Sequence, residues 1–290
     1  MKKELPTMTK KPDWLLVPHR KNENRKHVMG ILNSLGLNAV CTSAMCPNEA
    51  ECFESKTATF MILGTNCTRN CQFCNISHES PQDVDPNEPT NIALATKELG
   101  LKHVVVTSVT RDDLPEGGAS QFCKTILALK EHCPDTIIEV LIPDFNGNID
   151  ALKMVIDSGP HIIAHNVETV PTLYESVRPK AVYSRSLELI ANIKKNNSNI
   201  YSKSSIMVGF GETRNQVLQV MEDLRGVDCD FLTIGQYLAP SKRHLPVYEY
   251  IHPDIFEYYR KVAYDKGFKY VASGPFVRSS YQAHKAIKGI

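Results

Sequence analysis

Residues 57–74, TATFMILGTNCTRNCQFC, join a short apolar run to a loop with three cysteines. The run TATFMIL (57–63) is nearly continuously apolar, which is typical of a strand buried on both faces of a parallel sheet. Cys67, Cys71 and Cys74 follow at spacing C-x3-C-x2-C, and we call them the loop thiols. They therefore lie just beyond the carboxyl end of a predicted strand.

Five further runs rich in Val and Ile follow along the chain. They are HVVVTSV (103–109), TIIEVLI (136–142), HIIAHNVE (161–168), SSIMVGF (204–210) and DFLTIGQYL (230–238). Amphipathic stretches with helix signals lie between them: Asn148 and Thr213 are predicted caps, and Gly159 and Gly226 are predicted stops. Strands that alternate with helices predict a parallel sheet wound as a βα barrel.

The alternation predicts an α/β fold, a partial (β/α)6 TIM-type barrel with N- and C-terminal extensions, because six units are too few for the usual eight-stranded closure. We expect one structural domain in three segments. Residues 1–56 form an N-terminal extension that carries further cysteines, 57–245 the barrel, and 246–290 a C-terminal helix and extension. The loop thiols then lie at the carboxyl-end face, where such barrels place their chemistry.

The composition limits the possible partners. The 290 residues include 33 Lys and Arg against 32 Asp and Glu, so the chain lacks the basic excess that binding to nucleic acid phosphates favours. No apolar run approaches the roughly 18 to 20 residues of a membrane span, and no apolar segment follows the basic N-terminus. We expect a cytoplasmic monomer with neither nucleic acid nor membrane as a partner.

The nine cysteines are an odd number, and a reducing compartment would leave them available to metals. Three lie singly in apolar or helical surroundings, where we expect small buried structural residues: Cys123, Cys133 and Cys229. The rest are the loop thiols and a second group, which we call the N-terminal thiols: Cys41, Cys46 and Cys52.

Three thiols suit neither a disulfide nor a structural zinc site, which prefers four ligands. A [4Fe-4S] cube on three thiolates keeps one iron with an open coordination position, and an open iron can bind a substrate. A zinc site lacking one ligand and a redox pair with a bystander thiol stay open as alternatives at this point.

The strand and its C-x3-C-x2-C loop resemble the signature of the radical S-adenosylmethionine (SAM) enzymes. The resemblance implies that the loop thiols bind a [4Fe-4S] cluster whose open iron chelates the amino and carboxylate groups of SAM. An electron from the cluster then cleaves SAM to a 5′-deoxyadenosyl radical. The resemblance also implies SAM contacts at strand ends, for which the candidates are Thr107, Ser108, Asn166 and Glu168.

The N-terminal thiols, at spacing C-x4-C-x5-C, and blocks such as PNEAECF, TSVTRDDLPEGGA and SGPFVRSSY resemble the lipoyl synthase family, over nearly everything from residue 38 to 281. This resemblance implies a second, auxiliary [4Fe-4S] cluster held by the N-terminal thiols and by Ser280 of RSSY. It implies that sulfur from this cluster is inserted at C6 and C8 of a protein-bound octanoyl-lysine, using two SAM per lipoyl group.

The same resemblance implies the partners. They are octanoylated lipoyl-carrier domains, of 2-oxoacid dehydrogenase E2 and of the glycine-cleavage H protein, and an electron donor such as ferredoxin or flavodoxin. Arg178 and Arg278 are candidates for substrate or cofactor contacts. We expect no acid or base residue in catalysis, because a radical from a cofactor attacks the unactivated C–H bonds.

Two alternatives to this function remain. One is another radical SAM sulfur-insertion enzyme of the biotin synthase type, against which the serine-ended auxiliary site argues. The other is a two-cluster electron carrier without catalysis, although such carriers close each cube with four cysteines.

Two pairs of polar residues have structural interpretations. His161 and His165 lie on a predicted strand, where four residues span about 13 Å, so a shared metal ion is not expected. Asp112 and Asp113 are neighbours in sequence, and we expect them to order the loop after the second predicted strand.

Overall fold

The computed structural model describes residues 10–16, 23–43, 46, 48, 51–52 and 59–288. Its centre is an eight-stranded sheet in the order β1 to β8. The strands are β1 (Asn38–Ala39), β2 (Thr59–Ile62), β3 (His103–Ser108), β4 (Ile137–Leu141), β5 (Ile162–Ala164), β6 (Tyr201–Val208), β7 (Phe231–Gln236) and β8 (Tyr270–Gly274). The six predicted runs correspond to β2 to β7, although positions 57 and 58 of the first run lie outside the described residues.

The sheet is the predicted partial barrel. β2 to β8 run parallel, each paired with the next in chain order, whereas β1 pairs antiparallel with β2. Within the described ranges, no pairing joins β8 back to β1 or β2. The barrel is therefore open between its first and last strands.

The predicted number of six parallel strands is wrong, because β8 is a seventh. It pairs with β7 from Phe231 and Tyr270 to Gly235 and Gly274. β8 lies in the segment 246–290, which we assigned to a C-terminal extension. Its sequence YVASG ends in small residues of low strand tendency, so it lacks the apolar run that marked the other strands, and pairing with β7 makes it a strand.

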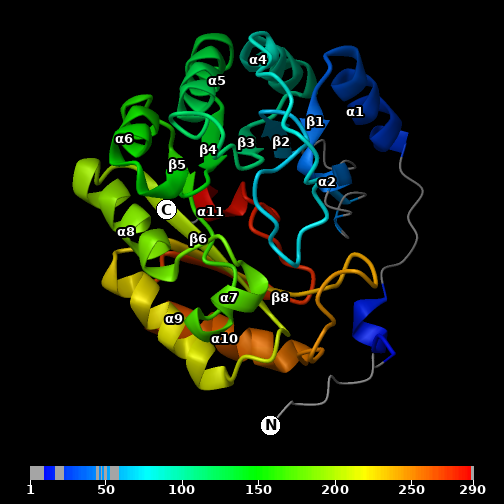
Figure 1. The fold of residues 1–290 in the computed structure, drawn as a ribbon, viewed down its shortest axis with the longest axis vertical. Helices are drawn as coiled ribbons and strands as arrows, with labels where there is room; N and C mark the ends of the chain where they lie inside the picture. Colours follow the sequence, from blue (N-terminus) through cyan, green and yellow to red (C-terminus); the bar gives the residue numbers. More distant parts are fainter. Residues whose placement is uncertain are drawn as a thin grey trace.

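The helices surround the sheet on its outer side, except for α11, which lies within the barrel (Figure 1). They are α1 (Glu23–Ser34), α2 (Val40–Ser43), α4 (Glu88–Leu99), α5 (Ala119–His132), α6 (Ile149–Asp157), α7 (Tyr174–Val177), α8 (Tyr183–Asn196), α9 (Arg214–Gly226), α10 (Pro253–Asp265) and α11 (Lys285–Lys288), with short 3-10 helices η1 (Asp13–Leu15), η2 (Phe145–Gly147) and η3 (Pro171–Leu173).

The predicted helix caps are confirmed. Asn148 Oδ1 accepts from Ala151 N at the start of α6. Thr213 and Gln216 form a capping box at the start of α9, which satisfies backbone N–H groups that have no partner inside the helix.

Strand residues alternate between the core and the barrel interior. Val104 on β3 and Val140 on β4 belong to the core beneath the helices, together with Phe122 of α5. Because successive strand residues face opposite sides, their neighbours face inward. The C-terminal segment partly fills this interior (Figure 1), since Ala286 of α11 packs against Ile162 and Phe231 at the amino ends of β5 and β7.

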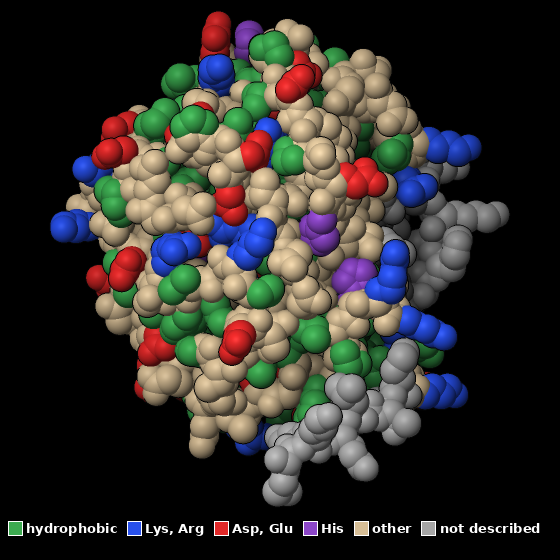
Figure 2. All heavy atoms as spheres, viewed as in Figure 1, with side chains coloured by type: hydrophobic (Ala, Val, Ile, Leu, Met, Phe, Trp, Pro, Cys, Tyr) green, Lys and Arg blue, Asp and Glu red, His purple; other side chains and the backbone are tan. Residues whose placement is uncertain are grey.

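The surface carries both signs of charge on the face seen in Figure 2, in keeping with the net charge of +1. Among the described residues, none of the helices combines the length and the apolar character that a membrane crossing needs.

Candidate metal and cofactor site

The loop thiols follow β2 at the carboxyl-end face of the barrel. Backbone hydrogen bonds define their loop: Cys67 N donates to Ser77 O (2.8 Å), and Cys74 N donates to Cys71 O (3.0 Å). Two N–H groups point at the Cys67 sulfur, those of Arg69 and Thr110, each 3.4 Å from Sγ. The loop is therefore already shaped around at least one of its sulfur atoms.

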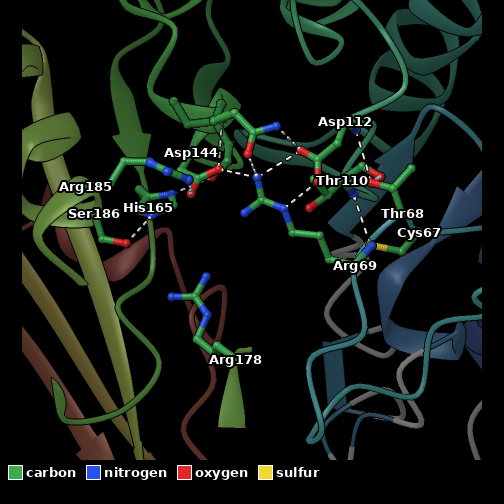
Figure 3. A network of polar contacts seen from close by, with 12 residues as sticks. Cys67, Thr68, Arg69, Thr110, Asp112, Asp144, His165, Arg178, Arg185 and Ser186 are labelled. Carbon is green, nitrogen blue, oxygen red and sulfur yellow. Dashed lines mark hydrogen bonds and ion pairs between the residues drawn. The ribbon is translucent and has the colours of Figure 1, made fainter. Parts of the chain in front are cut away.

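Arg69, between Cys67 and Cys71, anchors this loop to the ends of β3 and β4 (Figure 3). Its guanidinium binds Asp112 through Nε (2.7 Å) and Nη2 (2.9 Å), and Asp144 through Nη2 (2.6 Å). Burial opposes the charge of Arg69, but both carboxylates together raise its pKa above the ordinary value. Asp112 thus contacts the thiol loop, which was not predicted from the sequence, while Asp113 pairs with Arg111 on the same stretch after β3.

The N-terminal thiols lie where the N-terminal and C-terminal segments meet. Cys41 belongs to α2, Cys46 N donates to Cys41 O, and Cys52 N donates to Asn48 O, both at 2.9 Å. Asn48 Nδ2 donates to Phe276 O (2.6 Å). Only parts of residues 41–58 are described, so these contacts are those of the described residues.

The C-terminal segment reaches the N-terminal thiols through further contacts. Tyr281 Oη donates to Glu51 Oε1 at 3.0 Å, next to Cys52. A side chain at Gly235 on β7 would overlap the carbonyl oxygen of Val277. Gly235 thereby allows the segment before Arg278 to cross close over the strand.

One cavity of about 430 Å³ connects the two groups of thiols. Several of the predicted site residues line it: Cys41, Cys46, Cys52, Cys74, Asn166, Glu168, Arg278 and Ser280. The other predicted residues are not among its lining: Cys67, Cys71, Thr107, Ser108 and Arg178. The fold therefore brings together all the N-terminal thiols, one loop thiol and the serine.

The end of β5 presents polar groups to the cavity. Asn166 Nδ2 donates to Glu168 Oε1 (2.9 Å), and Asn166 Oδ1 is buried without a hydrogen-bond partner among the described residues. Glu168 has φ of +65°, and burial raises the pKa of its carboxyl while Arg178 and Arg278 oppose the rise. A buried acceptor without a partner is costly, so a ligand hydroxyl at Asn166 would stabilise the site.

Arg178 supports this turn from behind the cavity. Its Nη1 donates to Asn166 O (2.9 Å) and Val167 O (3.2 Å). The same guanidinium is close enough to Cys71 to oppose the rise in the pKa of that thiol, which burial causes. Arg178 therefore contacts both the β5 end and the thiol loop rather than the cavity.

The two candidates at the carboxyl end of β3 do not line the cavity. Thr107 Oγ1 donates to Leu141 O (3.0 Å) within the sheet. Ser108 Oγ is buried and has no hydrogen-bond partner in the described part of the chain. Of this pair, Ser108 is the one with a free polar atom.

Arg278 and Ser280 complete the side of the cavity that the C-terminal segment forms. Arg278 faces two acidic groups, the Cys46 thiol and Glu168, whose charges partly offset the lowering of its pKa by burial. Its Nη1 donates to the carbonyl oxygen of Val277 at 2.7 Å. Ser280 lines the same cavity as the N-terminal thiols.

The pKa values of two thiols, one in each group, are raised by burial and by neighbouring thiols. Burial, with the nearby Cys41 and Cys46, raises the pKa of Cys52 to about 12. Burial also raises the pKa of Cys74 to about 12, with contributions from Cys71 and Cys67. Neighbouring thiols contribute to both raised pKa values, whereas bound metal ions would stabilise the thiolates. Both groups could therefore serve as iron ligands.

The described residues give no support to a zinc site. Among them, no three His, Cys, Asp or Glu side chains are grouped to hold one metal ion. The thiolates of one tetrahedral zinc would lie within about 4 Å of one another, because each bond is near 2.3 Å. A cube attaches each thiolate to a different iron and does not require that grouping.

Of the three cysteines predicted to be buried, two are, and the two histidines make separate contacts. Cys133 and Cys229 are buried and Cys123 is partly buried. His165 lies between Ile142 O and Ser186 Oγ, each at 2.9 Å, and His161 Nδ1 accepts from Ile138 N. The two histidines thus serve separate strand contacts.

Sequence reasoning missed several residues of the cavity wall, including Thr59, Ser205, Met207 and Tyr237. Ser205 and Met207 alternate on β6 with Ile206 and Val208, which are core residues. This alternation could have marked them as interior positions. The contact of Asn48 with Phe276, 228 residues apart, has no comparable signal.

Comparisons with known proteins show the family of the chain. The model of the radical SAM superfamily matches residues 61–224. A lipoyl synthase of Alkaliphilus metalliredigens is 53% identical over 96% of both chains, and one of Caldicellulosiruptor saccharolyticus is 54% identical over 97% of this chain and 98% of its own.

Solved structures share the fold at low identity. Methylornithine synthase (PylB) has a TM-score of 0.55 at 15% identity, covering 74% of this chain and 70% of its own. SuiB of Streptococcus suis has a TM-score of 0.59 at 11% identity, covering 78% and 53%. With relatives above half identity over nearly the whole length, the chain belongs to the lipoyl synthase family of the radical SAM superfamily.

Proposed function

We propose that this chain converts a protein-bound octanoyl-lysine to lipoyl-lysine by inserting sulfur at C6 and C8. One observation carries the proposal: the N-terminal thiols, Cys74 and Ser280 line a single cavity of about 430 Å³. A cavity that borders both groups of thiols lets one substrate chain meet a SAM-cleaving centre and a sulfur-donating centre.

The thiols divide into two ligand sets in this proposal. Cys67, Cys71 and Cys74 hold the [4Fe-4S] cluster that binds SAM, and the N-terminal thiols with Ser280 hold the auxiliary [4Fe-4S] cluster. When bound, the clusters and SAM supply the hydrogen-abstracting radical and the sulfur, which no side-chain acid or base can provide. Cys41 and Cys46 contribute to the raised pKa of Cys52, and Cys67 and Cys71 to that of Cys74, so the thiols of each set lie near one another, as the ligands of one cluster must.

The remaining side chains bind and orient. Asn166 Oδ1, buried without a partner among the described residues, accepts a hydrogen bond from a SAM ribose hydroxyl, and Glu168 beside it accepts another. Arg178 holds this turn through the carbonyl oxygens of Asn166 and Val167. Ser108 Oγ also has no hydrogen-bond partner among the described residues, but Ser108 does not line the cavity and is assigned no SAM contact.

The apolar part of the wall suits an acyl chain. Leu141, Met207, Tyr237 and Val277 line the cavity together with the polar residues. An octanoyl chain that packs against them excludes water from the reacting carbons. The carriers are lipoyl-carrier domains of 2-oxoacid dehydrogenases and of the glycine-cleavage system, with a small reduced electron carrier as the donor.

The test uses the full chain, reconstituted with iron and sulfide without oxygen. We expect about eight irons per chain, four for each cube, and thiolated products by mass spectrometry after incubation with SAM, reductant and an octanoyl-lysyl peptide. Iron near zero with one zinc per chain, or SAM cleavage without any thiolated peptide, would contradict the proposal.

Two alanine variants separate the ligand sets. Replacing the N-terminal thiols by alanine should leave about four irons and SAM cleavage but no thiolation. Replacing the loop thiols should leave about four irons and no cleavage. A biotin synthase type of enzyme would act on dethiobiotin instead of the peptide, and an electron carrier would cleave no SAM.

A further inference from the structure

Arg69 lies inside the thiol loop, yet its guanidinium points toward Asp112 and Asp144 and not toward the thiols (Figure 3). The side chain is only 6% exposed. Its partners come from the loop after β3, which holds Asp112, and from the loop after β4, which holds Asp144 and Asn146, a further acceptor at 2.8 Å. One side chain therefore ties the thiol loop to two neighbouring strand ends.

The charges around Arg69 are balanced. Two cations, Arg69 and Arg185, meet two carboxylates, Asp112 and Asp144, and Arg185 Nη1 lies 3.2 Å from Asp144 Oδ2. Because the group is close to neutral, it adds little net charge at the thiols. Any effect of Arg69 on a bound cluster must therefore come from the position that it imposes on the loop.

Thr68 extends the anchor to the Cys67 sulfur. Its N and Oγ1 both donate to Thr110 O at 3.0 Å, and its Oγ1 accepts from Asp112 N at 3.0 Å. These bonds place the N–H groups of Arg69 and Thr110 on Cys67 Sγ, each at 3.4 Å. Hydrogen bonds to sulfur are among the factors that set the reduction potential of an iron–sulfur cluster.

We propose that Arg69 is a positioning residue for the cluster on the loop thiols. It keeps the two N–H groups on Cys67 and so makes the cluster easier to reduce before SAM cleavage. The inference rests on the proposed function, because it presupposes a cluster at this loop. Lysine retains the charge of Arg69 but lacks the planar fork that binds both carboxylates.

The experiment uses the full chain with Cys41, Cys46 and Cys52 replaced by alanine, so that one cluster remains. In this background, Arg69→Lys is compared with Arg111→Lys. Arg111 is a matched control, because it is 4% exposed and binds Asp113 by two nitrogens, and its hydrogen-bond partners, Asp113 and Leu63 O, lie outside residues 67–74. The midpoint potential is measured by a redox titration followed by electron paramagnetic resonance.

For Arg69→Lys we expect a midpoint potential more negative than that of Arg111→Lys, and SAM cleavage slower by roughly tenfold to 100-fold, the usual effect of losing support behind a metal ligand. A potential equal to or more positive than the control's overturns the positioning role. If the background chain itself binds no iron or cleaves no SAM, the proposed function has failed instead.

A milder variant covers the case in which Arg69→Lys does not assemble the cluster. Asp112→Glu keeps the charge of the group but displaces the carboxylate from the Arg69 guanidinium, and it leaves Arg69 bound to Asp144. We expect a shift of the potential in the same direction but smaller. No shift relative to Arg111→Lys would overturn the proposal.

Discussion

The two groups of thiols differ in how the fold holds them. The three loop thiols lie within eight consecutive positions after β2. An ion network of Arg69, Asp112 and Asp144 ties their loop to adjacent strands. Among the described residues, the segment of the N-terminal thiols meets the C-terminal segment through hydrogen bonds of Asn48 to Phe276 O and of Tyr281 and Gln282 to Glu51.

This difference matches the two tasks that we propose. Hydrogen bonds to charged groups contribute about 1.5 to 3 kcal/mol, against about 0.5 to 1.5 kcal/mol for neutral ones, so the ion network holds its loop more firmly than the amide contact of Asn48 holds Phe276. A rigid loop suits a cluster that must survive each turnover. A site closed between two chain segments suits a cluster that must come apart.

The largest expected effect comes from Ser280→Ala, which removes the proposed ligand from the C-terminal segment. We expect the thiolation rate to fall at least about tenfold, while SAM cleavage at the loop thiols continues. If both rates fall together, or if thiolation is unchanged, Ser280 does not act specifically with the N-terminal thiols. Thiolated peptide and 5′-deoxyadenosine are measured in the same reaction.

A smaller effect is expected from Gly235→Ala. The new Cβ would overlap Val277 O and lie 3.2 Å from Arg278 Nη1, so the C-terminal segment must shift at a cost of about 1 to 3 kcal/mol. Bound iron should fall from about eight toward about four per chain, with the loss at the N-terminal thiols.

Gly226→Ala is the matched control for that variant, because nothing lies within 4 Å of its added Cβ. It should keep its iron and its melting temperature. An unchanged iron content in Gly235→Ala, or an equal loss of SAM cleavage and thiolation, would contradict the assignment of the segment to the N-terminal thiols.

The smallest expected effect is on stability in acid, and it tests the ion pair of Asp144 with Arg69. Burial opposes ionisation of the Asp144 carboxyl, but the hydrogen bond and the charge of Arg69 outweigh this effect and lower the pKa of Asp144 to about 2. Arg185 and His165 also face this carboxylate. The stabilisation is complete above the unfolded-state pKa near 4 and is lost as pH falls toward 2, which amounts to about 2 kcal/mol.

Urea unfolding of the metal-free chain between pH 4 and 2 measures that loss. Asp144→Asn should remove this part of the pH dependence, whatever its effect on stability at neutral pH. An unchanged pH dependence in the variant would show that the ion network does not hold the loop.

The elements of the barrel were predictable where the signal is local. Apolar runs marked β2 to β7, and Asn148 and Thr213 marked helix starts, because these patterns depend on neighbours in the sequence. β8 was not predicted, because Ala272, Ser273 and Gly274 form a strand only through pairing with β7. Ser205 and Met207 do carry a local signal, the alternation with core residues on β6, but which cavity they line depends on the tertiary structure.

The sequence by itself determined the order of the elements, the spacing of both thiol groups and the family, because covalent spacing and local periodicity carry that information. Only the tertiary structure decided that Arg69 meets Asp112 and Asp144 and that Ser280 and the N-terminal thiols border one cavity. Such contacts join residues far apart along the chain, and they arise only when strand pairing and core packing bring the chain segments together.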